Sequence, residues 1–304
     1  MRLLIILLFF VQILLADSLV VSSTPIGSDE DNRSIMNPIN SSFPPNLQIG
    51  NIEILEIPIY VKSNVLDEIK MKISNFSNLT KVTESIDTRL YYRSITNSYV
   101  QIFDNQEFVL LTQNQIGRDG NTIIGYLKVE ANILNNQTYG NYSFNDTIHV
   151  KLANSTWVNN NFHVNANVAL VAIAGFNSTS SYSSGQQFVS DHINFGNFNF
   201  SSNNIEKNLY IKSNSSNNFR ITFNNTPNLI HELDNNYQIN MHYYYKQTGN
   251  TYFEIQAGTS FIAIVGKNEG LNPIGIMKFE TESISGSKLA GDYSTSVLVT
   301  VSAD

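Results

Sequence analysis

The sequence predicts an all-β fold made of two tandem antiparallel β-sandwiches, and three observations lead to it. First, short segments alternate apolar and polar residues, the period-two pattern of a strand with one buried face. Second, 42 of the 304 residues are Asn, a residue type that favours turns over helix interiors. Third, several segments recur about 150 residues further along the chain. No segment of ten or more residues shows a helical apolar stripe.

Residues 1–16 have the pattern of a signal peptide. Arg2 precedes an apolar run from Leu3 to Leu15, which ends at Ala16 and Asp17. The run is shorter than the ~20 apolar residues that span a bilayer, which disfavours the alternative of a permanent membrane anchor. We therefore expect an exported protein. The chain has no Cys, so its stability must come from packing and strand pairing rather than from disulfides.

The repeated segments keep both their order and their spacing. They are IYVKSN at 59–64 with LYIKSN at 209–214, LYYR at 90–93 with YYYK at 243–246, IGYLKVE at 124–130 with IGIMKFE at 274–280, and GNYS at 140–143 with GDYS at 291–294. Chance matches of short motifs do not preserve order in this way. The repeat predicts two homologous domains, 17–153 and 154–304, joined through the polar stretch around residues 159–161.

Each copy is expected to consist of strands separated by Asn-, Gly- and Pro-containing turns. Segments 69–73 and 219–223 alternate strictly, whereas 108–111 and 261–265 are continuous apolar runs typical of strands covered on both faces. These short strands favour an Ig-like sandwich in each copy. The alternating segment 297–301 closes the second copy, and we expect no later strand of that domain to pair with its outer edge.

The second copy resembles the spore coat protein U domain family, the pilin-like domains of archaic (Csu-type) chaperone–usher pili. Four segments carry this resemblance: FHVNANV at 162–168, INFG at 193–196, YYY at 243–245, and AGDY at 290–293 with the Val-rich strand that ends at Val301. Together with the repeat, they suggest two tandem copies of a pilin-like β-sandwich. The chain departs from the family pattern in lacking a disulfide near the start of the domain.

The resemblance implies a mechanism of assembly and a set of partners. Pilin-like domains of this family lack their last strand, which leaves an apolar groove and an unpaired sheet edge. A periplasmic chaperone fills the groove during export, an usher passes the subunit on, and the N-terminal strand of a neighbouring pilin subunit then replaces the chaperone by β-augmentation. The implied location is the periplasm in transit and then the cell surface, in a fimbrium.

Two sets of residues are expected to take part in this assembly. The donor-like strand places Phe162, Val164, Ala166 and Val168 on one face. The acceptor groove of the second copy is expected to be lined by Leu209, Ile211, Phe219, Ile221, Val297, Val299 and Val301. These seven residues would equally suit an ordinary sandwich core.

The first copy is expected to have no donor-like segment upstream, because the corresponding residues 12–18 straddle the expected cleavage point of the signal peptide. A two-domain subunit that accepts a strand but donates none is expected at the tip of a pilus. The resemblance therefore implies cell adhesion, with the first domain touching a surface of unknown identity. Exposed aromatic residues such as Tyr99, Phe103 and Tyr139 are candidates for that contact.

No pattern in the sequence indicates an enzyme, a cofactor or a bound metal. The five His residues have no metal-ligand spacing, and Asp119 in RDGN at 118–121 is a single carboxylate without the further acidic positions of a calcium loop. The net charge of −7 disfavours binding of nucleic acid. Trp157, the one Trp of the chain, is expected to pack across the domain junction.

One alternative function remains open from the sequence alone. Both sandwiches could be complete, which would make the chain a self-sufficient secreted binding module. Twelve Asn-X-Ser/Thr sequons, slightly more than chance provides, would allow such a module to be glycosylated.

Overall fold

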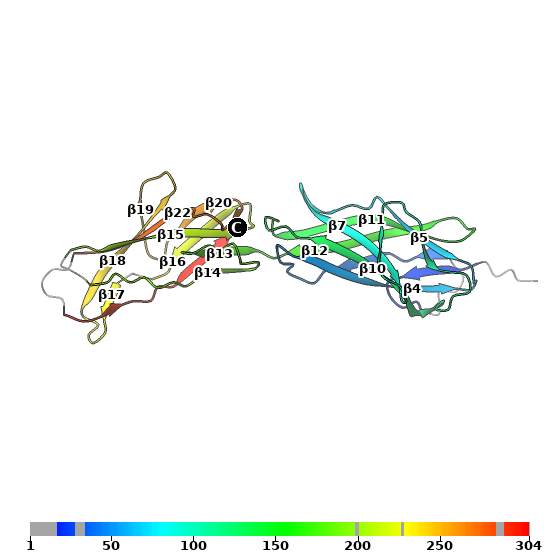
Figure 1. Ribbon diagram of the computed structural model, residues 1–304, viewed down its shortest axis with the longest axis horizontal. Helices are drawn as coiled ribbons and strands as arrows, with labels where there is room; N and C mark the ends of the chain where they lie inside the picture. The colour runs from blue at the N-terminus through cyan, green and yellow to red at the C-terminus, as the bar shows by residue number, and fades with distance from the viewer. Residues whose placement is uncertain (1–16, 28–33, 198–200, 226–227, 284–288, 304) are drawn as a thin grey trace, which may run out of the picture.

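The structure, a computed structural model, describes residues 17–27, 34–197, 201–225, 228–283 and 289–303. Two elongated lobes follow each other along one axis (Figure 1), and the described residues contain strands but no helix. No helix among these residues could therefore span a membrane. The expected signal peptide, residues 1–16, lies outside the described residues.

The first domain is a sandwich of two β-layers. One layer has the order β2-β1-β4-β10-β7-β8, and the other the order β9-β5-β11-β12-β3, with β6 pairing with both β7 and β11. Its strands are β1 (Leu19–Ser22), β2 (Ser34–Met36), β3 (Ile39–Ser42), β4 (Ile52–Ser63), β5 (Ile69–Ser74), β6 (Leu79–Lys81), β7 (Glu84–Ser94), β8 (Val100–Ile102), β9 (Phe108–Leu111), β10 (Asp119–Asn132), β11 (Gly140–Leu152) and β12 (Val158–Val168).

The second domain repeats this arrangement with a smaller second layer. The larger layer has the order β14-β13-β15-β22-β18-β17-β23, with β19 beside β18 and β21 beside β15, and the smaller layer has the order β20-β16-β24. Its strands are β13 (Val171–Gly175), β14 (Gly185–Phe188), β15 (Asn204–Ser213), β16 (Asn218–Phe223), β17 (Asn228–His231), β18 (Gln238–Gln247), β19 (Phe253–Ile255), β20 (Ser260–Val265), β21 (Asn268–Glu269), β22 (Gly275–Thr281), β23 (Tyr293–Ser294) and β24 (Val299–Ala303).

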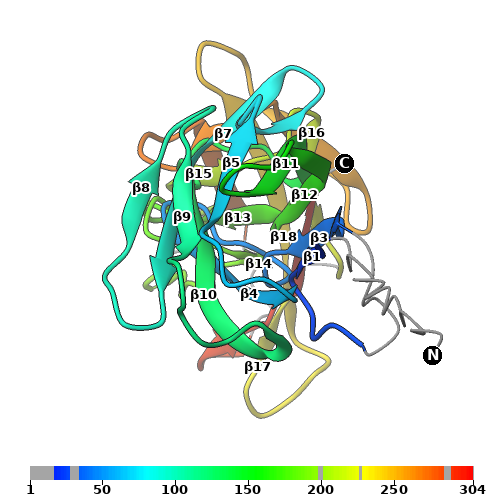
Figure 2. The ribbon, with the colours of Figure 1, turned by 90° about the vertical axis from the view of Figure 1, so that its right-hand side faces the viewer.

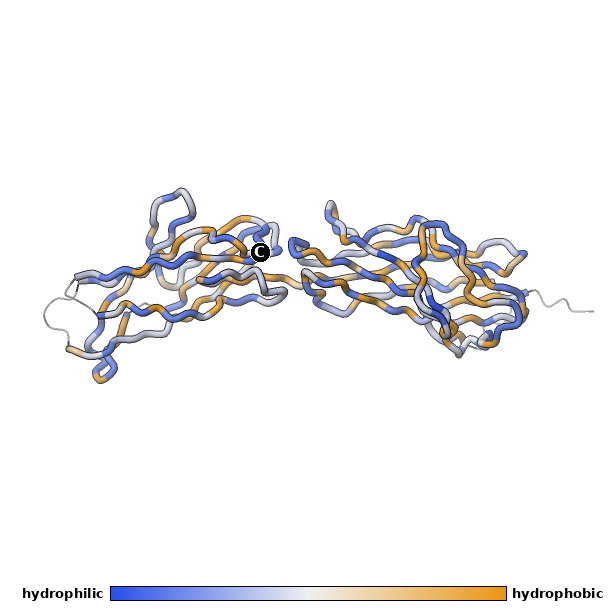
Figure 3. The backbone as a smooth tube through the Cα atoms, viewed as in Figure 1, coloured by the Kyte–Doolittle hydropathy of each residue, from blue (hydrophilic) through white to orange (hydrophobic). Residues whose placement is uncertain are grey.

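Period-two alternation produces both cores. Along β10, Leu127, Val129 and Ala131 are buried while the residues between them face outward, and apolar and polar segments alternate along the strands of both lobes (Figure 3). In the end-on view of Figure 2 the strands of the first domain wrap around a common interior. The fold class is thus the all-β pair of antiparallel sandwiches that the sequence predicts.

The two domains share specific contacts at matching positions. The hydroxyl of Tyr92 donates to the carbonyl of Leu110 at 3.1 Å, and the hydroxyl of Tyr245 donates to the carbonyl of Ala263 at 3.1 Å. A Cβ atom on Gly125 or on Gly275 would lie only 2.4 or 2.5 Å from a backbone carbonyl of the neighbouring strand. The recurrence of Gly in both copies therefore has a steric cause.

Strand β12 belongs to the first domain, which corrects the expected domain boundary. It pairs antiparallel with β11 along its whole length, from Gly140 opposite Val168 to Val150 opposite Val158. Its other edge pairs in parallel with β3. The boundary expected between 153 and 154 would separate β12 from the sheet in which it lies, and the chain instead passes to the second domain after Val168.

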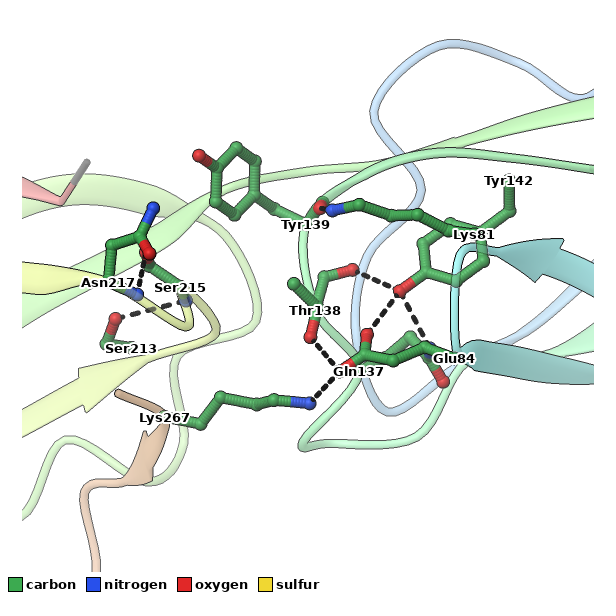
Figure 4. Close-up of polar contacts among 10 residues, drawn as sticks. All are labelled: Lys81, Glu84, Gln137, Thr138, Tyr139, Tyr142, Ser213, Ser215, Asn217 and Lys267. Atoms are coloured by element: carbon green, nitrogen blue, oxygen red, sulfur yellow. Dashed lines mark hydrogen bonds and ion pairs between the residues drawn. The ribbon is translucent and has the colours of Figure 1, made fainter. Parts of the chain in front are cut away.

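A polar contact joins the two domains at the end of β12 (Figure 4). Lys267, between β20 and β21, places its Nζ 2.6 Å from Oε1 of Glu84 at the start of β7. The Thr138 hydroxyl donates to Glu84 at 2.6 Å, and the Tyr142 hydroxyl lies 2.9 Å away. Burial alone would raise the pKa of Glu84, but these hydrogen bonds, with that from Lys267 foremost, outweigh it and hold the pKa at about 2. The carboxylate is therefore ionised at neutral pH.

Trp157 does not pack across the junction, contrary to the expectation. It lies in the β11–β12 hairpin, at the opposite end of β12 from Val168. Its ring has Lys151 Nζ at 4.4 Å and Lys72 Nζ at 4.9 Å from the centroid. The residue therefore stabilises the outer end of the first domain.

A buried carboxyl group makes the stability of the first domain depend on pH. Asp146 occupies an inward-facing position of β11 and is 3% exposed. The hydroxyl of Ser77 donates to it at 2.8 Å and the backbone N–H of Ser77 at 3.3 Å. Burial raises the pKa of Asp146 from 3.8 to about 6, although the hydrogen bonds from Ser77 act in the opposite direction.

Replacement of Asp146 by Asn is expected to stabilise the first domain at about pH 8. Because the folded-state pKa exceeds the unfolded value, the stability that protonated Asp146 contributes is present below about pH 4 and is lost as the pH rises through about 6. The neutral amide avoids this loss, so the gain should be about 1–3 kcal/mol at pH 8 and near zero at pH 4. Urea unfolding at both pH values measures it, with exposed Asp87→Asn as the control. A destabilised D146N at pH 8 would contradict the assignment.

Candidate functional site

A groove of about 1050 Å³ runs along one side of the second domain. One wall is formed by the end of the chain, residues 289–297 with Val299, and the opposite wall by residues 190–197. The floor is largely aromatic and consists of Phe176, Phe188, Phe223, Leu229, Met241, Tyr243 and Phe279. The groove thus reaches the core of the second sandwich.

The position of the groove can be read from the strand register. In the first domain, Ile148 of β11 pairs with Ile73 of β5, and in the second domain Val299 of β24 pairs with Phe223 of β16. Segments β23 and β24 therefore occupy the place of β11. The neighbour of β11 on its other edge is β12, and in the described second domain no strand pairs with that edge of β24.

Burial confirms that the second domain is open at this edge. In β11 the inward-facing side chains Phe144, Asp146, Ile148, Val150 and Leu152 are buried. Their counterparts in the second domain, Thr295, Val297, Val299, Val301 and Ala303, are only half-buried. The difference follows from β12, because its side chains cover the β11 row, whereas in the described second domain β13 and β14 lie near β24 but no strand pairs with its outer edge.

The opposite wall corresponds to β3 of the first domain. Strand β14 pairs in parallel with β13 as β2 pairs with β1, and residues 190–197 follow β14 as β3 follows β2. In the first domain β12 lies between β11 and β3. The groove is therefore the space in which the second domain would hold a strand equivalent to β12.

Tyr243 is the polar group of the groove floor. Its side chain is 1% exposed, and its ring lies 4.6 Å from that of Phe223 and 5.8 Å, edge-on, from that of Phe279. Its hydroxyl is buried without a hydrogen-bond partner among the described residues, and burial raises its pKa. An unpaired buried hydroxyl is energetically unfavourable, because its desolvation is not compensated by a hydrogen bond.

The structure separates the seven residues expected to line the groove. Val297 and Val299 do line it. Val301 lies half-buried beyond the groove and packs against the second core. The other four are fully buried in that core and do not reach the groove: Leu209, Ile211, Phe219 and Ile221. For these four the ordinary core interpretation holds, since they lie on strands in the middle of each layer.

The expected donor-like strand is used within the chain. Phe162, Val164, Ala166 and Val168 do share one face of β12, but all four are buried in the core of the first domain. The ring of Phe162 packs edge-on against Phe144 at 5.2 Å. The period-two pattern was sufficient to predict the strand, but it could not show which of the two neighbouring sandwiches receives it.

The aromatic residues of the floor were missed by the sequence analysis. The repeat contains information that identifies three of these aromatic residues, because the residues at the matched positions of the first domain are aliphatic. Ile73 corresponds to Phe223, Leu90 to Tyr243, and Val129 to Phe279. A comparison of the two copies for differences, rather than for similarities, would have marked these positions.

The carboxylate considered for a calcium loop has a structural role in the first domain. Asp119, the residue of the calcium-loop candidate, accepts hydrogen bonds from the backbone N–H groups of Asn121 and Thr122 and so caps a turn. No group of three or more His, Cys, Asp or Glu side chains in the described residues could hold a metal ion. The groove can instead offer backbone N–H and C=O groups on two walls and an apolar floor between them.

No protein-family model matches the sequence, and no curated protein matches it. Among solved structures, the chain is similar to one from the CsuC–CsuE chaperone–tip adhesion subunit pre-assembly complex of archaic chaperone–usher Csu pili of Acinetobacter baumannii. The identity is 12% and the TM-score 0.48, over 87% of this chain and 98% of that chain. It is also similar to the CFA/I enterotoxigenic E. coli adhesin CfaE, at 12% identity and TM-score 0.34 over 89% of this chain and 93% of that one. The CupB6 tip adhesin from Pseudomonas aeruginosa has 10% identity and TM-score 0.34, over 85% of this chain and 90% of that one.

Hydrogen exchange is expected to distinguish the two matched edges. Backbone amides of β11 have strand neighbours on both sides, whereas those of β24 have a neighbour only in β16. Amides of 297–303 should therefore exchange at least about tenfold faster than those of 146–152, measured on peptides by mass spectrometry. Strand β16, which is paired on both sides, is the internal control. Equal protection of β11 and β24 would show that the groove is closed in solution.

Proposed function

We propose that this chain is an exported adhesion subunit at the tip of a chaperone–usher pilus, and that its second domain is completed by a strand from another protein. The half-burial of Val297 and Val299, where the matched residues of the first domain are covered by β12, carries this proposal. The occupant of the groove is an extended segment that pairs antiparallel with β24 and presents alternate apolar side chains to the aromatic floor.

The donated strand would come from two partners in succession. An open edge beside an apolar groove promotes aggregation, so a periplasmic chaperone would supply a strand during export. At the usher, the N-terminal strand of a neighbouring pilin subunit would replace it. The sequence resemblance to the spore coat protein U domain family supports this order of events, and the groove gives it a physical basis.

The junction within this chain supports a head-to-tail direction of assembly. Strand β12 ends at Val168, where the second domain begins. In the second domain β24 runs toward the junction, so the chain end lies near the middle of the molecule (Figure 1). A strand that pairs antiparallel with β24, as β12 pairs with β11, would run away from the junction. It would leave the groove at the end of the second domain farthest from the first domain. The donor's own body would then extend the long axis, away from the first domain.

This geometry leaves the outer end of the first domain free for attachment. Two loops meet there, because the backbone N–H of Asn114 donates to the carbonyl of Leu66 at 3.0 Å. Arg118 ties them together by donating to the carbonyls of Val65 at 3.1 Å and Asp67 at 2.7 Å. Ile116 on this end is 90% exposed, which suits contact with an apolar surface.

The aromatic residues suggested for attachment lie elsewhere. Tyr139 is half-buried at the domain junction, where its backbone N–H donates to Asn214. The hydroxyl of Tyr99 donates to Glu56 on the side of the first domain. Phe103 remains exposed, in the turn after β8. We therefore place attachment at the two outer loops rather than at these three residues.

Replacement of Val299 by Lys is expected to abolish the complex with the chaperone. The charge would enter the groove and could not be desolvated beneath a bound strand. Leu298→Lys is the matched control, because Leu298 is 65% exposed on the other face of the same strand. On co-expression with the cognate chaperone, wild type and L298K should yield one-to-one complexes by size-exclusion chromatography, and V299K should not.

The same experiment includes a check of folding. The thermal transition of the first domain should be equal in both variants, because the substitutions lie in the second domain. If wild-type chain is a stable monomer without any partner, or if V299K still forms the complex, the second domain does not need a donated strand. The chain would then be the self-sufficient secreted module.

Replacement of Ile116 by Asp is expected to weaken attachment to apolar surfaces at least about fivefold. The substitution places a charge where apolar contact area would be buried, at little effect on folding. Val82→Asp is the matched control, since Val82 is 97% exposed but lies in the β6–β7 turn near the junction. Retention of fluorescent chaperone-bound subunit on polystyrene beads measures attachment. Equal loss in both variants would argue against the outer loops.

A further inference from the structure

We propose that the strand accepted by the second domain carries a polar, hydrogen-bonding side chain at the position opposite Val299, and that the Tyr243 hydroxyl selects it. This inference rests on the proposed function and specifies the chemistry of the partner. It would distinguish a cognate donor strand from one that is merely apolar at every inward position.

The unpaired hydroxyl is the first observation. Tyr243 lines the groove, is 1% exposed, and its hydroxyl has no hydrogen-bond partner among the described residues. Two other buried Tyr hydroxyls, which correspond to each other in the two domains, do have a partner. Tyr92 donates to the carbonyl of Leu110, and Tyr245 donates to the carbonyl of Ala263. The residue that corresponds to Tyr243 in the first domain is Leu90, which needs no partner. The hydroxyl is thus a feature of the open domain alone.

The strand register is the second observation. The ring of Tyr243 stacks on Phe223, and Phe223 pairs with Val299. The corresponding pair in the first domain is Ile73 with Ile148, and the residue of β12 opposite Ile148 is Asn160. A strand bound at the same register therefore places its counterpart of Asn160 beside Val299, at the level of Tyr243.

Asn160 shows that this position accepts a polar side chain. It has the same parity in β12 as the buried Phe162 and Val164, so it faces inward, yet it is polar and half-buried. Its Nδ2 donates to the carbonyl of Met36 at 2.8 Å. In the second domain a side chain of this kind would lie next to Tyr243, whose hydroxyl can donate to an amide oxygen.

The Tyr243 hydroxyl would favour a donor strand with a polar residue opposite Val299 over one with an aliphatic residue there. A polar residue at this position removes two unpaired groups at once, its own and the Tyr243 hydroxyl. An aliphatic residue leaves the hydroxyl buried and unpaired beneath the bound strand. A site built for a hydrogen bond therefore discriminates against a partner that lacks it more strongly than an apolar pocket discriminates between apolar residues.

The test uses the chain's own complementing strand as the probe. Full-length chain is refolded with a labelled peptide of sequence 158–168, VNNNFHVNANV, or with its Asn160→Leu form, and the affinity of each peptide is measured by competition. The same pair of peptides is measured with Tyr243→Phe, which removes the hydroxyl and keeps the ring. Tyr245→Phe is the matched control, because it removes a hydroxyl from the same strand that already pairs within the chain.

The expected result is a change in the ratio of the two affinities. The preference for the Asn peptide over the Leu peptide should fall about five- to tenfold in Y243F and stay unchanged in Y245F. An unchanged ratio in Y243F, with both peptides bound, overturns the inference and leaves the proposed function intact. If neither peptide binds wild type and neither prevents its aggregation, the groove is not a strand acceptor and both proposals fail.

Discussion

A strand whose inward face is apolar needs a neighbour on each edge, and the rest of this structure depends on how that need is met. In the first domain, β12 meets it for β11 by pairing along its whole length and covering the β11 side chains. In the described second domain nothing does so for β24, and the core is open through a groove of about 1050 Å³. The same fold thus occurs once closed and once open within one chain.

The order of the two domains along the chain indicates the direction in which a further domain would be added. Strand β12 completes the first domain, and the second domain begins directly after it. This connection within the chain has the form that the proposed donated strand would give to the connection between the second domain and the donor protein. The ion pair between Glu84 and Lys267 adds a polar contact across that link. The hydrogen bonds that hold the Glu84 pKa at about 2 keep its charge in place at neutral pH. The junction therefore indicates how a further sandwich could follow the second one.

The sequence was sufficient for the fold class and for the matched segments, because alternation and the repeat report local geometry. It could not show which sandwich contains β12, since Phe162 and Val168 suit either one and only the pairing of β12 with β11 and β3 decides. It also could not separate groove from core. Leu209 of β15 and Val299 of β24 are both apolar residues at inward-facing positions. Leu209 lies on a strand in the middle of a layer, whereas Val299 lies on a strand at an open edge. Position within the sheet, which the sequence does not encode locally, determines the difference.

The aromatic floor of the second domain is consistent with the difference between a tethered strand and a separate one. Strand β12 is joined to β11 by a short hairpin, so its effective concentration at the first domain is high and modest contacts suffice. A strand from another protein must bind through contact energy alone. At three matched positions the first domain has Ile73, Leu90 and Val129, and the second has Phe223, Tyr243 and Phe279. Larger aromatic surfaces bury more area per residue, so the enlarged floor lies where a strand without a tether would need the additional affinity.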